Sequence, residues 1–104
     1  MDQFIQQIVA ELKNKISEKF DILEFIVFGS TARRERRPDS DIDVFVRLSH
    51  INRQIEEALF DIAYEVELKY DCLIDIIVFG NDAVSKKLEE TPVYQKVLEE
   101  GVAV

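Results

Sequence analysis

The apolar residues of this chain recur mostly with the period of an α-helix. In residues 2–20, and again from about residue 52 to residue 69, they return every three or four positions, which indicates one buried stripe on each of two amphipathic helices. Thr91-Pro92 and Gly101 are start and stop signals that predict a third helix at residues 93–100. Residues 83–89 are compatible with one further short helix.

Three shorter apolar runs follow a different pattern. Residues 23–28, 41–46 and 73–78 are rich in β-branched and aromatic side chains, which is typical of strands. Strands and helices in this order predict an α/β (α+β) fold, a small mixed β-sheet with helices packed on one face. A chain of 104 residues suffices for one such domain, spanning residues 1–104.

The first predicted strand ends abruptly in Gly29-Ser30. Glycine allows the backbone to approach a ligand closely or to adopt a positive φ. Ser30 is a suitable cap for a short helix through about residue 36, whose free amide groups would favour an anion. Taken alone, however, Ser30 is more often only a helix cap.

Three aspartates lie on or beside the other two predicted strands. Strand alternation places Asp41 and Asp43 on one face, and Asp75 joins them if the third strand lies beside the second. Three carboxylates this close would repel one another and hold protons or recruit cations. Magnesium suits such an all-oxygen site. Asp41 alone could be a turn residue, whereas Asp43 lies inside a strand, where an uncompensated acid is costly.

The charge and composition of the chain argue against some classes of function. The net charge of −8 argues against general binding to a nucleic-acid backbone. Residues 31–40 are locally basic, with four arginines against two acids, and form either a solvated surface or a contact to phosphate or a protein partner. No apolar stretch approaches the ~20 residues of a membrane span, and the N-terminus does not resemble a signal peptide. The single cysteine, Cys72, fits a reducing cytoplasm, where we expect the protein to act.

The remaining candidate residues favour structural roles. His50 is the only histidine and is expected at the surface of a loop. Tyr64, Tyr70 and Tyr94 occupy helical positions and are interpreted as packing residues. Cys72 is expected to be inert. The chain has neither a P-loop motif, nor zinc-ligand spacing, nor an evident partner for a Ser-His-Asp triad.

The chain resembles the nucleotidyltransferase superfamily that includes DNA polymerase beta. The resemblance lies in Gly29-Ser30, followed after ten residues by Asp41-x-Asp43, and in a later strand aspartate, Asp75. More closely, the chain is similar to the minimal nucleotidyltransferases of prokaryotes. The similarity includes Arg37-Pro38-Asp39-Ser40 before the acidic pair and the ending Thr91-Pro92-Val93-Tyr94, then Leu98-Glu99-Glu100-Gly101-Val102. It therefore covers nearly the whole chain.

The resemblance implies roles for these residues. Asp41 and Asp43 would ligate magnesium, and Asp75 would complete the site, which commonly holds two ions, and help to activate an acceptor hydroxyl. Gly29 and Ser30 would hold the phosphates of ATP, and we expect Arg33 to contact the nucleotide as well. Members of the family transfer a nucleotide monophosphate, typically AMP from ATP, and release pyrophosphate.

The resemblance also implies a partner. Minimal members commonly form toxin–antitoxin pairs with a HEPN-type RNase toxin encoded by an adjacent gene, and modify a tyrosine of that toxin. A chain of about 100 residues has no room for a second domain that would hold an acceptor, so we expect a partner or a second copy to supply the acceptor surface.

Two alternatives stay open. Arg34 stands where the family usually has glycine, which would fit an antitoxin that acts mainly by binding, with little or no catalysis. Transfer to a small hydroxyl compound is the other alternative, and the lack of room for an acceptor domain disfavours it.

Overall fold

The computed structural model describes residues 3–29, 41–80 and 92–104. Within these ranges, all the helices and strands predicted from sequence are present, with ends shifted by a few residues. The predicted short helices at residues 30–36 and 83–89 lie outside the described residues. None of the described helices is both long and apolar enough to cross a membrane. The elements are α1 Gln3–Ser17, β1 Ile22–Phe28, β2 Ile42–Leu48, α3 Arg53–Tyr70, β3 Ile74–Gly80, α5 Pro92–Glu100 and β4 Val102–Ala103.

The described strands form one mixed sheet in the order β3-β2-β1-β4. β1 runs antiparallel to both β2 and β4, whereas β2 and β3 are parallel. Parallel strands need a long crossover connection, and α3 supplies it between β2 and β3. The predicted mixed sheet is thus confirmed, and β4 is a short edge strand that the sequence did not predict.

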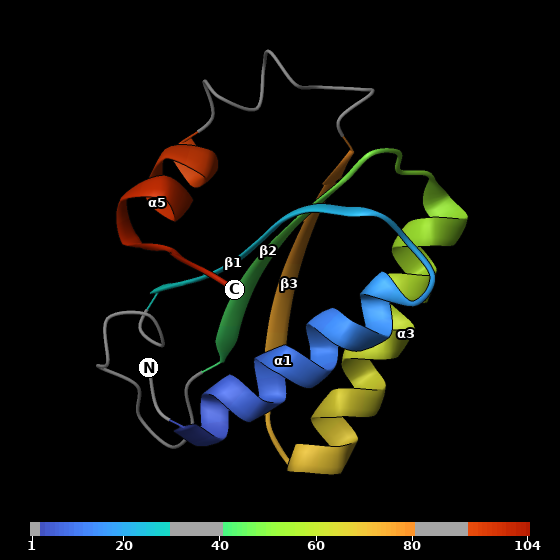
Figure 1. Cartoon of the computed structure of the whole chain (residues 1–104), viewed down its shortest axis with the longest axis vertical. Helices are drawn as coiled ribbons and strands as arrows, with labels where there is room; N and C mark the ends of the chain where they lie inside the picture. The colour runs from blue at the N-terminus through green and yellow to red at the C-terminus, as the bar shows by residue number, and fades with distance from the viewer. Residues whose placement is uncertain (1–2, 30–40, 81–91) are drawn as a thin grey trace.

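α1 and α3 lie together on one face of the sheet (Figure 1). Their apolar stripes pack on the residues of β1 and β2 that point to this face, which forms the larger core. Phe4 departs from the predicted stripe: it is 52% exposed, and its ring meets that of Tyr70 edge-on at 5.9 Å. The fully buried members of this core are Ile8, Val9, Leu12, Ile16, Val27, Ile42, Val44, Val46, Leu48, Leu59 and Val66.

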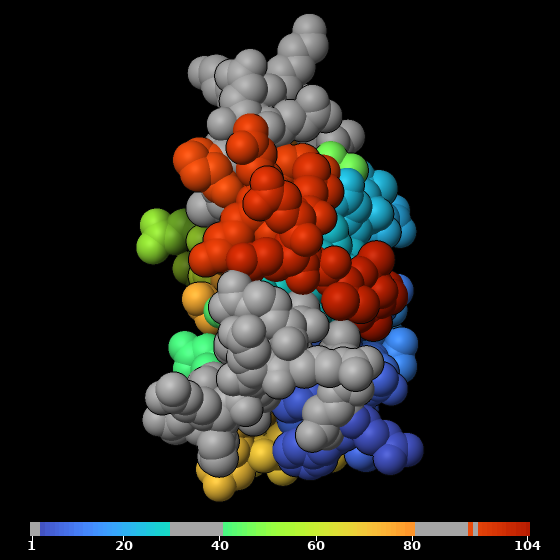
Figure 2. Space-filling view, turned by 90° about the vertical axis from the view of Figure 1, so that its left-hand side faces the viewer, coloured from blue at the N-terminus to red at the C-terminus, as the bar shows by residue number. Residues whose placement is uncertain are grey.

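α5 packs on the opposite face of the sheet, where Tyr94 and Val97 join Ile26, Phe28 and Phe45 in a second core. The predicted packing of helices on one face therefore describes α1 and α3, and α5 covers the other face. The physical reason lies in β2, whose Phe45 points away from α1 and α3 and is 0% exposed under α5. Figure 2 shows α5 and the C-terminal residues lying across this second face.

The ends of α3 determine how β3 aligns with β2. Asn52 caps the helix by accepting a 2.8 Å hydrogen bond from the Ile55 amide, and Asp71 ends it in the left-handed conformation at φ 51°. The Glu67 carboxylate then accepts a 2.9 Å hydrogen bond from the Ile74 amide at the start of β3. The Leu73 carbonyl accepts another from the Ile42 amide at 2.9 Å, which joins the beginnings of the two strands.

Candidate active site

Asp43 and Asp75 lie side by side on neighbouring parallel strands. The two residues are direct partners in the register of β2 and β3, so their Cα atoms are about 4.8 Å apart and their side chains leave the same face of the sheet. This is the face that α5 covers further along the strands, because Asp43 alternates with Phe45. Asp43 is half-buried and Asp75 is exposed. The condition on which Asp75 was expected to join Asp43, that the third strand lies beside the second, is therefore met.

Gly29 brings its backbone directly against the Asp43 carboxylate. The last residue of β1, Phe28, pairs with Asp43 across the antiparallel ladder. Gly29 follows with φ +72°, and a Cβ atom at this position would lie 2.3 Å from Oδ2 of Asp43. Only glycine combines this backbone conformation with so close an approach. The positive φ predicted for the glycine is therefore present, and the close approach of its backbone is to the Asp43 carboxylate.

Asp41 lies one residue before β2 and is exposed. Among residues 3–29, 41–80 and 92–104, no group of three or more His, Cys, Asp or Glu side chains forms a ready-made metal site. The structure therefore places one aspartate pair in strand register and a third aspartate just outside the strand. Such a set fits magnesium, which is commonly held by one or two carboxylates and completes its shell with water and substrate phosphates.

The other two residues predicted to contact the nucleotide, Ser30 and Arg33, lie outside the described part of the chain. Their contribution stays a prediction. The described half of the Gly-Ser turn ends at Gly29, directly beside the acidic pair.

An apolar layer continues along the sheet from the acidic pair. The ring centroid of Phe45 lies 5.6 Å from that of Phe79 on β3 and 5.5 Å from that of Tyr94 on α5. Ile77, the next residue after Asp75 on the same face of β3, packs against this cluster. Such a layer lowers the local dielectric constant, which strengthens the interaction of the neighbouring carboxylates with cations.

A polar network beyond this layer attaches α5 to the sheet. Arg47 of β2 donates to Oε1 of its ladder partner Glu24 on β1, and the Tyr94 hydroxyl donates to the same oxygen at 3.3 Å. The sequence analysis assigned no role to Glu24 or Arg47 and expected only packing from Tyr94. Opposite charges within two otherwise apolar strands are the signal that would have found the pair.

The two remaining candidates are consistent with structural roles. His50 is exposed in the segment after β2, and Cys72 is half-buried between α3 and β3, where it packs against the larger core.

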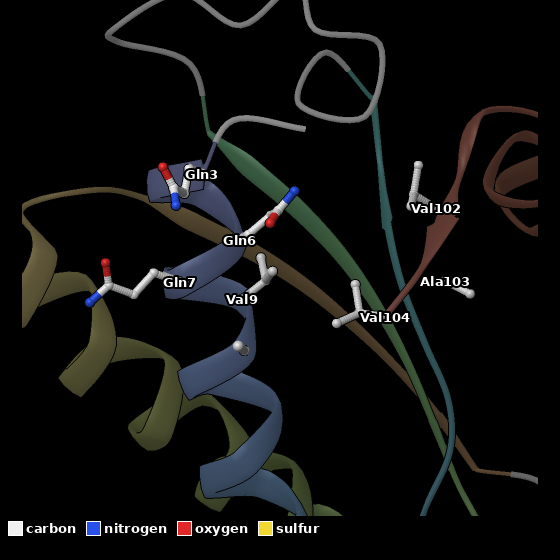
Figure 3. A pocket seen from close by; sticks show the side chains of 8 residues that line it. Gln3, Gln6, Gln7, Val9, Val102, Ala103 and Val104 are labelled. Atoms are coloured by element: carbon white, nitrogen blue, oxygen red, sulfur yellow. The ribbon is translucent and has the colours of Figure 1, made fainter.

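The described residues also line a cavity of about 510 Å³ between the first turns of α1 and the C-terminal residues. Figure 3 shows Gln6 and Val9 of α1 on one side of it and Val102 and Val104 on the other. None of the described residues that line this cavity belongs to the predicted site.

The mixed sheet and the aspartates on its neighbouring strands are typical of one family of proteins. Residues 9–104 match the family model of the nucleotidyltransferase domain. The chain therefore belongs to the nucleotidyltransferase domain family, which confirms the resemblance found in its sequence.

Relatives of known description extend over almost the whole chain. The protein adenylyltransferase MntA of Thermococcus cleftensis is 30% identical over 100 residues, which cover 96% of this chain and 92% of that protein. A protein of Methanocaldococcus jannaschii, provisionally described as a protein adenylyltransferase, is also 30% identical over 100 residues, covering 96% and 93% of the two chains.

Solved structures share the fold. A protein provisionally described as a minimal nucleotidyltransferase superposes with a TM-score of 0.69 at 22% identity, covering 100% of this chain and 97% of the other. A toxin–antitoxin complex with AMP-PNP gives 0.64 at 17% identity, with 94% and 70% covered. The complex of a tri-AMPylated Shewanella oneidensis HEPN toxin with MNT antitoxin gives 0.59 at 17% identity, with 99% and 71% covered.

Proposed function

We propose that this chain is a magnesium-dependent protein adenylyltransferase that transfers AMP from ATP to a tyrosine hydroxyl of a HEPN-type RNase toxin and so acts as its antitoxin. The observation that carries the proposal is the register of Asp43 beside Asp75, with Gly29 against the Asp43 carboxylate. Paired carboxylates next to a glycine turn are suited to a metal-assisted transfer of a nucleotide. Relatives described as protein adenylyltransferases support the choice of nucleotide and acceptor class.

The residues of this chain would divide the work as follows. Asp41, Asp43 and Asp75 would hold the magnesium ions, and Gly29, Ser30 and Arg33 would hold the phosphates of ATP. Bound magnesium would neutralise phosphate charge and stabilise the attacking and leaving oxygens. Because Gly29 limits the space around the Asp43 carboxylate, that side chain would need little reorganisation during the reaction.

The transfer itself exchanges one phosphorus–oxygen bond for another. The acceptor oxygen forms a bond to the α-phosphorus of ATP while the bond from that phosphorus to the oxygen bridging to the β-phosphorus breaks. Pyrophosphate leaves with the electron pair. The exposed Asp75 carboxylate would accept the hydroxyl proton, since it is the more accessible acid of the pair. Positioning and charge neutralisation supply most of the catalysis in such transfers.

Transfer of labelled AMP from ATP to the partner tests this proposal. The chain is incubated with α-³²P-labelled ATP, Mg²⁺ and the HEPN-type toxin encoded beside it, and the partner is examined for label and for loss of RNase activity. We expect label on the partner tyrosine, loss of label with EDTA, and a reduction of about a hundredfold or more with Asp43→Asn, which removes one charge from the acidic pair. Absence of label from the partner, or equal labelling by Asp43→Asn, would refute the proposal.

The same experiment separates the two alternatives. An antitoxin that acts by binding alone would suppress the toxin equally well as wild type and as Asp43→Asn. A transferase for small molecules would leave the toxin unlabelled and would label a hydroxyl compound such as an aminoglycoside, detected by mass spectrometry.

A further inference from the structure

Large apolar side chains form an exposed stripe along α3. Phe60, Tyr64 and Leu68 follow one another at four-residue spacing and are 44%, 60% and 66% exposed, and Leu73, just beyond the helix, is 60% exposed. The prediction that Tyr64 is a packing residue is therefore wrong within the described structure. We call these four residues the α3 stripe. A row of large exposed apolar side chains of this kind favours a site of interaction.

Acidic residues line the α3 stripe along one side. At 100° per residue, three carboxylates project on this side of the Phe60–Tyr64–Leu68 line, and Glu56 continues the line toward the N-terminal end of α3. Arg53 lies 3.3 Å from one of them, Glu57, and Lys15 lies 3.8 Å from another, Glu65. Both ion pairs are largely exposed, so they offset little of this charge. The flanking acids are Glu57, Asp61 and Glu65, whereas the half-buried Glu67 lies toward the core and accepts the hydrogen bond from the Ile74 amide.

This charge pattern selects the occupant. A second copy docked antiparallel through the same stripe would place acids opposite acids, which costs several kcal/mol at an interface. An anionic lipid surface would be repelled in the same way. The surface fits instead a protein with an apolar ridge and lysine or arginine residues along one side of it, and the net charge of −8 favours such a basic partner at longer range.

The position of the α3 stripe relates it to the acidic pair. The C-terminal end of α3 leads directly into β3 (Figure 1). Leu73 lies in this connection and precedes Asp75 by two residues. The Leu73 carbonyl also accepts the hydrogen bond from Ile42, the residue between Asp41 and Asp43. The aspartates leave the opposite face of the sheet from α3, so a protein bound along the stripe would reach them around the edge strand β3.

We propose that the α3 stripe is the docking surface for the acceptor protein, which presents an apolar ridge with basic side chains along one side. The inference rests on the proposed function, because it takes the acceptor to be a protein. It adds where that protein binds and which chemistry recognises it. The stripe would hold the acceptor while the acidic pair carries out the transfer.

The test compares matched pairs of exposed apolar residues. Tyr64→Gln with Leu68→Gln changes the stripe, and Leu23→Gln with Leu98→Gln changes two residues that are 46% and 59% exposed elsewhere. Affinity for the HEPN-type toxin is measured by calorimetry, and binding of a fluorescent ATP analogue with Mg²⁺ serves as the folding control. We expect the stripe variant to bind the toxin about tenfold more weakly or worse, the control variant to bind it normally, and both to bind nucleotide.

A charge variant tests the basic character of the partner. Asp61→Asn with Glu65→Gln should slow association severalfold and reduce its dependence on salt. Unchanged toxin affinity in the stripe variant, or salt-independent association of the wild type, would overturn the docking inference. So would a dimer of the wild-type chain, seen by sedimentation, that the stripe substitutions dissociate.

Asp43→Asn separates failure of the docking inference from failure of the proposed function. This variant should bind the toxin like wild type without labelling it. If wild type labels the toxin and the stripe variant binds and labels it equally well, only the docking inference is contradicted. If wild type neither binds nor labels the toxin, both the docking inference and the proposed function are contradicted.

Discussion

At the scale of single residues, Gly29 and Asp43 form one unit. The glycine has φ +72°, and its missing side chain leaves the space that Oδ2 of Asp43 occupies. The sequence predicted both residues, because a glycine after an apolar strand and an acid inside the next strand each require an explanation. It did not show that they contact each other, since this contact depends on the antiparallel register of Phe28 with Asp43.

Gly29→Ala should reduce transfer far more than stability. An alanine at positive φ costs about 1–2 kcal/mol, and its Cβ would displace the Asp43 carboxylate. A displacement of about 1 Å at a reacting centre can cost about a hundredfold in rate. Steady-state labelling of the toxin and thermal unfolding would measure the two effects.

Gly101→Ala is the matched control. A Cβ atom there would lie 2.2 Å from the Val97 carbonyl oxygen and 2.3 Å from Cγ2 of Ile26, away from the acids. We expect this variant to unfold at a lower temperature and to keep its transfer rate when folded. If Gly29→Ala lost no more activity than Gly101→Ala, the proposed role of the glycine–aspartate contact would be wrong.

At the scale of elements, helical periodicity predicted α1 and α3, start and stop signals predicted α5, and runs of β-branched and aromatic residues predicted β1, β2 and β3. The sequence did not predict that α5 lies on the opposite face, because periodicity identifies the buried side of a helix and not the surface that covers it. β4 was missed because two residues are too few to show alternation. Two polar contacts between elements, one on each face of the sheet, lead to the next predictions.

Tyr94→Phe should loosen α5. The substitution removes the hydroxyl that donates to Glu24 at 3.3 Å and leaves the aromatic packing on Phe45. The free energy of unfolding in urea should fall by about 1 kcal/mol, the usual net value of such a hydrogen bond. Tyr64→Phe, at a 60% exposed position, should change it by less than about 0.5 kcal/mol. Equal effects of the two substitutions would contradict the proposed attachment of α5.

Glu11 on α1 joins α1 to α3 and gives stability a dependence on pH. Its carboxylate accepts hydrogen bonds from Lys69 at 2.7 Å and from the Tyr70 hydroxyl at 3.1 Å. The hydrogen bond from Lys69 is the main cause that lowers the pKa of Glu11 below 4.5, and the same bond raises the pKa of Lys69 above 10.5. The contribution of Glu11 is therefore present above pH 4.5 and lost as pH falls through its folded pKa.

Glu11→Gln should accordingly lower the unfolding temperature at pH 7, and the difference from wild type should shrink as pH falls below 4.5. The contribution of Lys69 has the opposite sign, since it is present below pH 10.5 and lost as pH rises through the raised pKa. Thermal unfolding of both proteins across this range measures the effect. A difference that stayed constant from neutral to acidic pH would contradict the proposed ion pair.

At the scale of the whole molecule, the candidate site depends on strands that are distant in sequence. Asp43 and Asp75 become neighbours only because α3 crosses over and returns the chain parallel to β2. From the sequence, Asp75 was expected to join Asp43 only if the third strand lay beside the second. The parallel register of β2 and β3 meets this condition. The parts of the site that depend on Ser30 and Arg33 remain predictions, because those residues lie outside the described ranges.

The most direct test of this account is a double-mutant cycle on metal binding. Free Mn²⁺, which can replace Mg²⁺ and is visible by electron paramagnetic resonance, is titrated into wild type, Asp43→Asn, Asp75→Asn and the double variant, with Asp61→Asn as control. If both acids hold the same ion, each single substitution weakens binding and the two effects are non-additive by more than about 0.5 kcal/mol. Additive effects, or a single variant that binds like wild type, would contradict a shared metal site.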